Sequence, residues 1–141
     1  MDYKEILKYV IIIIIGIIIT QHMNVVASPS MEPVLHKGDI IFVDSNVNNI
    51  QIGDIIVYYG TWTGEPLNIV HRVIEINQKN GTTTYITKGD NNFTNPCPDP
   101  VIIYPNDLRY KLITINKNPI IMPKIGYISL FFQGKINNPS G

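Results

Sequence analysis

Few side chains in this chain of 141 residues can act as a nucleophile or as a catalytic base. The candidates are serines and three histidines, because the single cysteine, Cys97, lies between two prolines in a stretch typical of a loop. A serine attacks a carbonyl carbon only when a base held in a fixed position takes its proton. The residues therefore favour serine–histidine nucleophilic catalysis, in which an aspartate orients the histidine.

Ser30 is the serine whose surroundings best suit a nucleophile. Pro29 and Pro33 lie on either side of the segment 30–32 and restrict its backbone angles. A restricted backbone holds a reactive oxygen in a reproducible position. The same composition also fits an ordinary proline-rich linker, so Ser30 alone does not establish catalysis.

His71 is the histidine best placed to act as a base. It lies in segment 68–77, where apolar and polar residues alternate as in a strand, and an apolar setting holds a neutral imidazole in one tautomer. Without the other motifs, a half-buried structural histidine on a strand is the favoured interpretation of His71. His22, after an apolar segment, is expected at an interface, and His36, before a Lys-Gly-Asp turn, is expected in solvent.

An apolar segment precedes these residues. Residues 7–27 are mostly apolar and include a nearly pure isoleucine run from Ile11 to Ile19. Twenty helical residues span about 30 Å, the thickness of a bilayer core, so we expect a transmembrane helix within residues 1–27 and a β-rich catalytic domain at 28–141. Lys4 and Lys8 place the N-terminus in the cytoplasm by the positive-inside rule. The alternatives are a secretory signal cleaved near Ala27 and a buried core helix.

The remainder of the chain is typical of short antiparallel strands, so the expected fold class is mainly β. Gly-Asp turns precede two β-branched segments, and Asn80-Gly81 indicates a hairpin turn. The proline-rich stretch 91–100 is expected to be a loop, and the apolar stretch 127–132 a last strand or a patch on lipid. The expected strands are 40–43, 55–58, 68–77, 82–87, 110–115 and 120–122.

Composition excludes several function classes. The formal net charge is zero and no basic stripe is interleaved with aromatic residues, so nucleic-acid binding is not expected. One cysteine forms neither an internal disulfide nor a cysteine-based metal site. We expect no metal and no cofactor.

Four short segments occur in an order that resembles one protein family. They are residues 28–33, 53–58, 70–73 and 87–92. Together with the N-terminal segment they resemble type I signal peptidases, and specifically the archaeal and endoplasmic-reticulum branch. The bacterial branch uses a lysine base where this chain has His71. The resemblance implies a signal-peptidase-like antiparallel β domain with one N-terminal transmembrane helix.

The resemblance also implies roles for individual residues. Ser30 is the expected nucleophile and His71 the expected base, while the Ser30 N–H and the Ser28 hydroxyl are expected to stabilise the oxyanion. In that branch an aspartate after the Gly-Asp-Asn-Asn motif is the partner of the histidine. That position falls here on Asp99, but its interval from Asp90 is longer than in the usual pattern. Asp90, within the motif, is the alternative partner.

The implied activity is that of a membrane-bound serine endopeptidase that removes N-terminal signal peptides from secreted preproteins at the outer membrane surface. The expected partners are preproteins, the lipid bilayer and the translocation machinery, and the expected location is the cell membrane, with a single pass and the catalytic domain outside. One alternative is a membrane-tethered β-rich binding module without catalysis. Another is the related self-cleaving repressor domain, which normally carries a lysine base and a DNA-binding module that this chain lacks.

Overall fold

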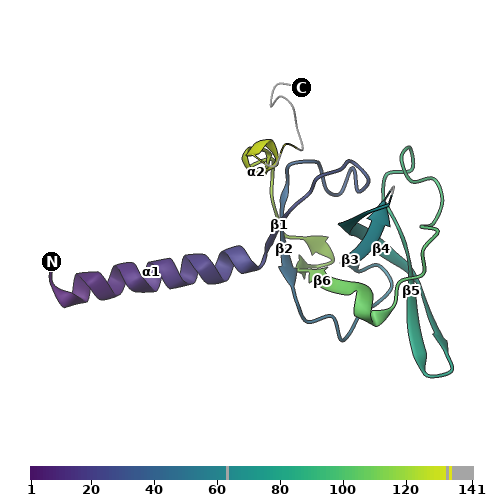
Figure 1. Cartoon of the computed structure of the whole chain (residues 1–141), viewed down its shortest axis with the longest axis horizontal. Coiled ribbons are helices and arrows are strands. Elements are labelled where there is room, and N and C mark those ends of the chain that lie inside the picture. Colours follow the sequence, from purple (N-terminus) through teal and green to yellow (C-terminus); the bar gives the residue numbers. More distant parts are fainter. Residues whose placement is uncertain (63, 133, 135–141) are drawn as a thin grey trace.

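The computed structural model of the chain describes residues 1–62, 64–132 and 134. A long N-terminal helix projects from a β-rich body, and a short helix lies near the place where the two meet (Figure 1). The helices are α1 (Tyr3–Gln21), the 3-10 helix η1 (Pro105–Asp107) and α2 (Tyr127–Phe132). The strands are β1 (Met23–Val25), β2 (Ile40–Asp44), β3 (Ile55–Trp62), β4 (Glu65–Lys79), β5 (Thr82–Lys88), β6 (Leu108–Leu112), β7 (Thr114–Ile115), β8 (Asn118–Pro119) and β9 (Ile121–Met122). The described chain after α1 is mainly β, which confirms that part of the expected fold class.

One sheet forms the body of the described structure. Its order is β1-β2-β6-β3-β4-β5, and β9 also pairs with β2. All of its strand pairs are antiparallel, as the sequence predicts. β7 and β8 form a separate two-stranded sheet. Because β3, β4 and β5 are neighbours, side chains from three consecutive strands are available to meet at one place.

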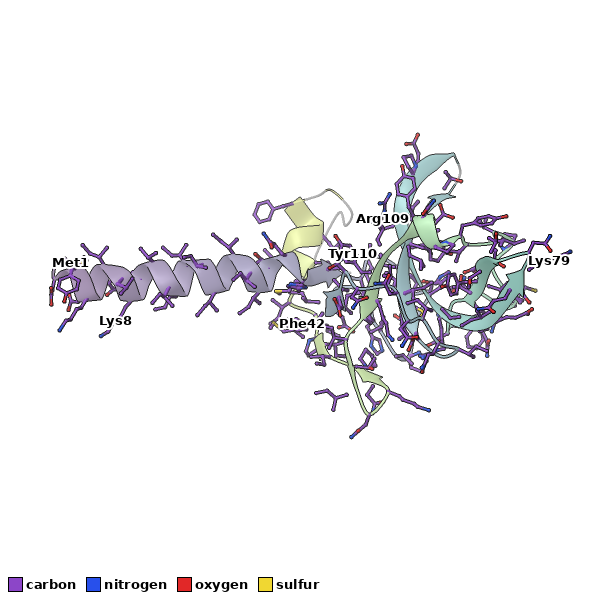
Figure 2. All side chains as sticks on the ribbon, turned by 90° about the horizontal axis from the view of Figure 1, so that it is seen from below. Met1, Lys8, Phe42, Lys79, Arg109 and Tyr110 are labelled. Carbon is purple, nitrogen blue, oxygen red and sulfur yellow. The ribbon has the colours of Figure 1, made fainter. Side chains whose placement is uncertain are left out.

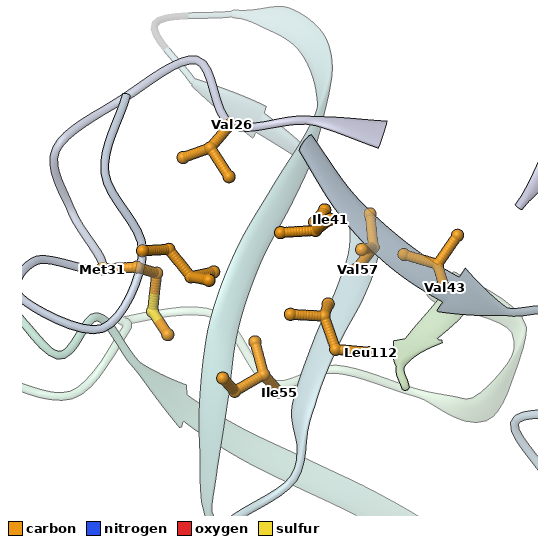
Figure 3. Close-up of a cluster of buried hydrophobic side chains, with 8 residues drawn as sticks. Val26, Met31, Ile41, Val43, Ile55, Val57 and Leu112 are labelled. Atoms are coloured by element: carbon orange, nitrogen blue, oxygen red, sulfur yellow. The ribbon is translucent and has the colours of Figure 1, made fainter. Parts of the chain in front are cut away.

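Apolar side chains are buried on both faces of β3. Successive side chains of a strand point to opposite faces, so Ile55 and Val57 join one cluster while Ile56 and Tyr58 join the other. The first cluster, shown in Figure 3, is Val26, Met31, Leu35, Ile41, Val43, Ile55, Val57 and Leu112. The second is Ile50, Ile56, Tyr58, Val73, Tyr85, Ile103 and Leu108. Met31 is 1% exposed, so the residue after Ser30 is fixed in the core.

α1 contributes to neither cluster. It contains no buried residue, and its side chains project outward along a helix that extends away from the body (Figure 2). In the part of the chain that the structure describes, no helix combines the length and the apolar character needed to cross a membrane. The expected transmembrane helix is therefore not shown. Lys4, Glu5 and Lys8 lie within α1, and the apolar stretch 9–19 that follows spans about 16 Å, roughly half of a bilayer core.

The apolar stretch near the C-terminus forms a helix, so its expectation as a last strand is wrong. The backbone N–H of Leu130 donates to the carbonyl of Gly126 at 3.0 Å, a helical hydrogen bond. Leu130 is buried, whereas Ile128 and Phe132 are exposed. Five of the six residues in this stretch are apolar, and a short apolar run does not by its pattern distinguish a helix from a strand.

Candidate active site

His71 of β4 contacts Asp99, which lies in the 91–100 loop. His71 Nδ1 is 2.6 Å from Asp99 Oδ2, and the two side chains are only 9% and 11% exposed. A carboxylate accepts hydrogen bonds, so Nδ1 carries the proton and donates it to Asp99. This tautomer leaves the lone pair of Nε2 available, which is the atom that takes a proton in general-base catalysis. Of the two candidate aspartates, the structure therefore places Asp99 against His71.

Thr87 and Tyr58 hold the same carboxylate. Thr87 Oγ1 and Tyr58 OH donate to Asp99 Oδ2 at 2.6 and 3.1 Å, and the Asp99 N–H donates to the Thr87 carbonyl at 2.8 Å. Burial alone raises the pKa of Asp99, but the hydrogen bonds from His71, Thr87 and Tyr58 outweigh it and lower that pKa below its usual value. Asp99 is therefore ionised near neutral pH. Burial, together with the charge of Asp99, raises the pKa of Tyr58, so its hydroxyl remains a donor.

Arg72 binds the other candidate aspartate. It follows His71 in β4, and adjacent side chains of a strand point to opposite faces. Its Nε and Nη2 donate to the two carboxylate oxygens of Asp90 at 2.8 and 2.6 Å, and Nη1 donates to the Gly53 carbonyl at 2.8 Å. The hydrogen bond with Asp90 raises the pKa of Arg72, against the opposing effect of burial. Asp90 thus ties β4 to the loop after β5 and does not orient His71.

Ser30 lies in the turn-rich connection between β1 and β2, and the loop after β5 holds this connection in place. The Asn91 N–H donates to the Ser30 carbonyl at 2.9 Å, and Asn91 Nδ2 donates to the Pro29 carbonyl at 3.0 Å. The Ser30 hydroxyl lies 3.0 Å from that of Ser28. Two of the four segments singled out in the sequence, 28–33 and 87–92, therefore lie directly against each other.

Gly89 permits this close contact. It is buried, and a Cβ atom placed on it would lie 2.5 Å from the Ser30 carbonyl oxygen and 2.7 Å from Asn95 Cγ. A carbon atom does not approach a backbone oxygen so closely, so the position requires a residue without a side chain. The glycine of the Gly-Asp-Asn-Asn motif thus has a steric reason to be there.

Gly89→Ala is expected to lower both stability and reactivity, because the added carbon forces the Ser30 carbonyl and the 89–95 loop apart. Overpacking of this kind costs about 1–3 kcal/mol of unfolding free energy. Chemical denaturation measures the first effect, and labelling by a serine-directed acylating probe measures the second. Gly16→Ala is the matched control, since a Cβ atom there meets nothing within 4 Å. Wild-type stability and labelling of the Gly89→Ala chain would contradict the steric argument.

The structure does not join all of the candidates. Among the described residues, no hydrogen bond links Ser30 to His71, and the hydrogen-bond partner of the Ser30 hydroxyl is Ser28. Catalytic hydrogen bonds are often long until a substrate is bound. His22 lies exposed at the end of α1, and its Nδ1 donates to the Val43 carbonyl at 3.1 Å. In the described part of the chain, no group of three His, Cys, Asp or Glu side chains is arranged to hold a metal ion.

Comparison with known proteins assigns the chain to a family. Residues 3–93 match the family described as signal peptidase, peptidase S26. The chain belongs to this family. It is 33% identical over 127 residues to the signal peptidase complex catalytic subunit SEC11 of Scheffersomyces stipitis, covering 86% of this chain and 73% of that protein. SEC11 of Saccharomyces cerevisiae (strain YJM789) is 35% identical over 117 residues, covering 77% of this chain and 64% of that subunit. An uncharacterized protein of Methanocaldococcus jannaschii is 25% identical over 177 residues, covering 82% and 86%.

These matches confirm the resemblance seen in the sequence. The chain is a type I signal peptidase of the archaeal and endoplasmic-reticulum branch, and hence a serine peptidase. A binding module without catalysis is not favoured.

Sequence analysis of this signal peptidase missed the residues that support the candidate group. Tyr58, Thr87 and Asn91 all lie inside the segments that carry the resemblance, yet neither spacing nor residue type gives them a role. Tyr58 and Thr87 lie far apart in sequence and meet only because β3 and β5 flank β4. Their positions within those segments were the one signal available.

Proposed function

We propose that this signal peptidase removes N-terminal signal peptides from secreted preproteins, with Ser30, His71 and Asp99 as its catalytic residues. The observation that carries the proposal is the 2.6 Å contact between His71 Nδ1 and Asp99 Oδ2. It orients a neutral imidazole with Nε2 available as a base. Asp90 is left out of the catalytic group because both of its carboxylate oxygens bind Arg72.

In the proposed reaction, Nε2 of His71 takes the proton of Ser30 as the serine oxygen attacks the scissile carbonyl carbon. His71 then gives that proton to the leaving amine, the C–N bond breaks, and the signal peptide remains as an ester on Ser30. A water molecule, deprotonated by His71, attacks the ester, and Ser30 recovers its proton. The charge of Asp99 stabilises the imidazolium that forms in each half of the reaction.

The Ser28 hydroxyl has a proposed role in stabilising the oxyanion, together with the Ser30 N–H. It lies 3.0 Å from the Ser30 oxygen, so it is within reach of a carbonyl that this oxygen attacks. Ser28→Ala is expected to lower kcat by 10²–10³-fold, since loss of one oxyanion donor costs about 3–4 kcal/mol. Single-turnover cleavage of a preprotein measures this loss. An unchanged rate would remove Ser28 from the oxyanion site.

Membrane association is also proposed, with the reaction at the outer membrane surface. The side chains of residues 11–15 and 17–19 are all exposed isoleucines on α1, and burying them in lipid would remove a large apolar area from water. In this arrangement residues 1–27 attach the protein to lipid and residues 28–141 form the catalytic domain, to whose sheet β1 contributes three residues of the first part. A secretory signal also leaves its cleavage site next to the apolar segment that enters the membrane.

The function is tested with the purified full chain in detergent and a preprotein that carries a cleavable signal. We expect a single cut at the end of the signal, identified from the masses of the two products. The control substrate is the same preprotein with a bulky residue in place of the small residue before the cut, and it should remain intact. Failure to cut the first substrate, or equal cutting of both, would count against signal-peptide removal.

A further inference from the structure

Three hydrogen-bond donors converge on one oxygen of Asp99. His71 Nδ1, Thr87 Oγ1 and Tyr58 OH lie 2.6, 2.6 and 3.1 Å from Oδ2. They come from β4, β5 and β3, so the three adjacent strands each supply one donor. A serine peptidase needs only one of these contacts, the one from the histidine, to fix the tautomer. The other two contacts call for a separate explanation.

Tyr58 touches both members of the His71–Asp99 pair. Its hydroxyl donates to Asp99, and its ring meets the imidazole edge-on, with ring centroids 6.5 Å apart and an interplanar angle of 66°. Tyr58 is 3% exposed and Thr87 is fully buried, so both hydroxyl groups are largely shielded from water. A buried hydroxyl needs a partner, but any backbone carbonyl would satisfy that need. Here both hydroxyls instead donate to Asp99 Oδ2, the carboxylate oxygen that binds His71.

We propose that Tyr58 and Thr87 are positioning residues, which hold the Asp99 carboxylate against His71 and withdraw part of its negative charge from the imidazole. This inference rests on the proposed function, in which His71 is the base. Each O–H dipole presents its positive end to Oδ2, so each hydroxyl reduces the field with which Asp99 stabilises an imidazolium. Asp99 therefore stabilises a protonated His71 less than a carboxylate with a single donor would.

The groups that surround the His71–Asp99 pair are consistent with a reduced effect of the Asp99 charge on the imidazole. Tyr58 faces Asp99 from β3 and Thr87 from β5, and Tyr58 remains a neutral donor because burial and the nearby carboxylate raise its pKa. The neighbouring charges, Arg72 and Asp90, neutralise each other in a bidentate pair. The two hydroxyls are therefore the groups best placed to adjust the charge that His71 experiences.

The test is the pH dependence of kcat/KM for preprotein cleavage by the full chain in detergent. Tyr58→Phe and Thr87→Val each remove a hydroxyl while keeping the shape of the side chain. Each is expected to move the acid limb of the profile to higher pH by roughly half to one unit, since the imidazolium becomes more stable. Thr87→Ser keeps the hydroxyl and is expected to restore the wild-type midpoint. Tyr85→Phe is the matched control, because Tyr85 packs in the same cluster but makes no described hydrogen bond to Asp99.

A purely structural role predicts a different result. In that case each of the two variants, Tyr58→Phe and Thr87→Val, lowers kcat/KM by a factor that does not depend on pH. The midpoint of the acid limb is then unchanged, and this result would overturn the proposal. A second measurement is independent of activity: the NMR titration of His71 in the Ser30→Ala chain, with and without Tyr58→Phe. An upward shift of the His71 midpoint supports the proposal and an unchanged midpoint overturns it. Failure of the proposed function would give a different result: the single variant Ser30→Ala would still cleave the preprotein.

Discussion

Ser30→Ala is expected to abolish preprotein cleavage, with kcat lowered by roughly 10⁶-fold, the scale of loss when a catalytic serine is removed. The variant loses the oxygen that forms the ester but keeps the backbone that holds the site, since Asn91 binds the carbonyls of Pro29 and Ser30 rather than the hydroxyl. Cleavage kinetics and labelling by a serine-directed acylating probe should both fall to background. The unfolding free energy should stay close to that of the wild type.

Ser45→Ala is the control for this variant. Ser45 is exposed and lies just after β2, outside the segments that meet at the site, so its loss should change neither cleavage nor labelling. If Ser30→Ala cleaved a preprotein at the wild-type rate, Ser30 would not be the nucleophile. Loss of cleavage in both variants would point to a general defect in the preparation rather than to a catalytic oxygen.

Asp99→Asn is expected to lower kcat by roughly 10⁴-fold, the scale seen when the aspartate of a serine–histidine–aspartate triad becomes asparagine. The amide has the same shape but carries no charge to stabilise the imidazolium. Its N–H₂ group also donates hydrogen bonds, and this favours the histidine tautomer with the proton on Nε2. Steady-state kinetics gives the loss of kcat, and nitrogen chemical shifts of His71 report the tautomer.

Asp90→Asn makes the same chemical change to the carboxylate that binds Arg72. It should cost about 1–3 kcal/mol of unfolding free energy, as for hydrogen bonds to charged groups, and lower kcat far less than Asp99→Asn does. Similar losses of kcat in the two variants would contradict the assignment of Asp99 as the partner of His71.

The lowered pKa of Asp99 adds a stability readout for the Asp99→Asn variant. A carboxyl whose pKa is lower in the folded than in the unfolded state stabilises the fold above its unfolded value, about 4 for aspartate. That contribution is lost as the pH falls through the folded value. Asp99→Asn should therefore lower the unfolding free energy at pH 7, and the difference from the wild type should shrink below about pH 4.

The sequence locates the candidate residues but does not choose between the two aspartates. His71 and Arg72 are adjacent in β4 and face opposite sides, so each needs a carboxylate on its own side of the sheet. Which aspartate reaches which side depends on the path of the 91–100 loop. That path is set by a contact with a distant strand, the hydrogen bond from the Asp99 N–H to the Thr87 carbonyl, and no local pattern encodes it.

Some features of the fold follow from neighbouring residues in the sequence, and others depend on residues that are far apart in it. Alternation and turn residues predict most of the strands, because both are properties of neighbouring residues. The insertion of β6 between β2 and β3 is not predicted, since it pairs residues about 50 to 70 positions apart along the chain. The helix α2 is missed for a different reason, because a short apolar run fits a helix and a strand equally well.

The junction between α1 and the sheet determines how far Ser30 lies from the end of α1. Two hydrogen bonds between His22 and Val43 stabilise this junction. The His22 carbonyl accepts from the Val43 N–H at 2.8 Å, and the His22 ring donates to the Val43 carbonyl at 3.1 Å. If the nine residues 22–30 formed a flexible linker, the distance between its ends would average roughly 15–18 Å and the position of the nucleophile would not be fixed. Because β1 pairs with β2 and His22 is hydrogen-bonded to Val43, Ser30 instead lies at a fixed distance from the end of α1. In the proposed membrane arrangement, this fixed distance would favour substrates with a matching number of residues between the apolar segment and the scissile bond.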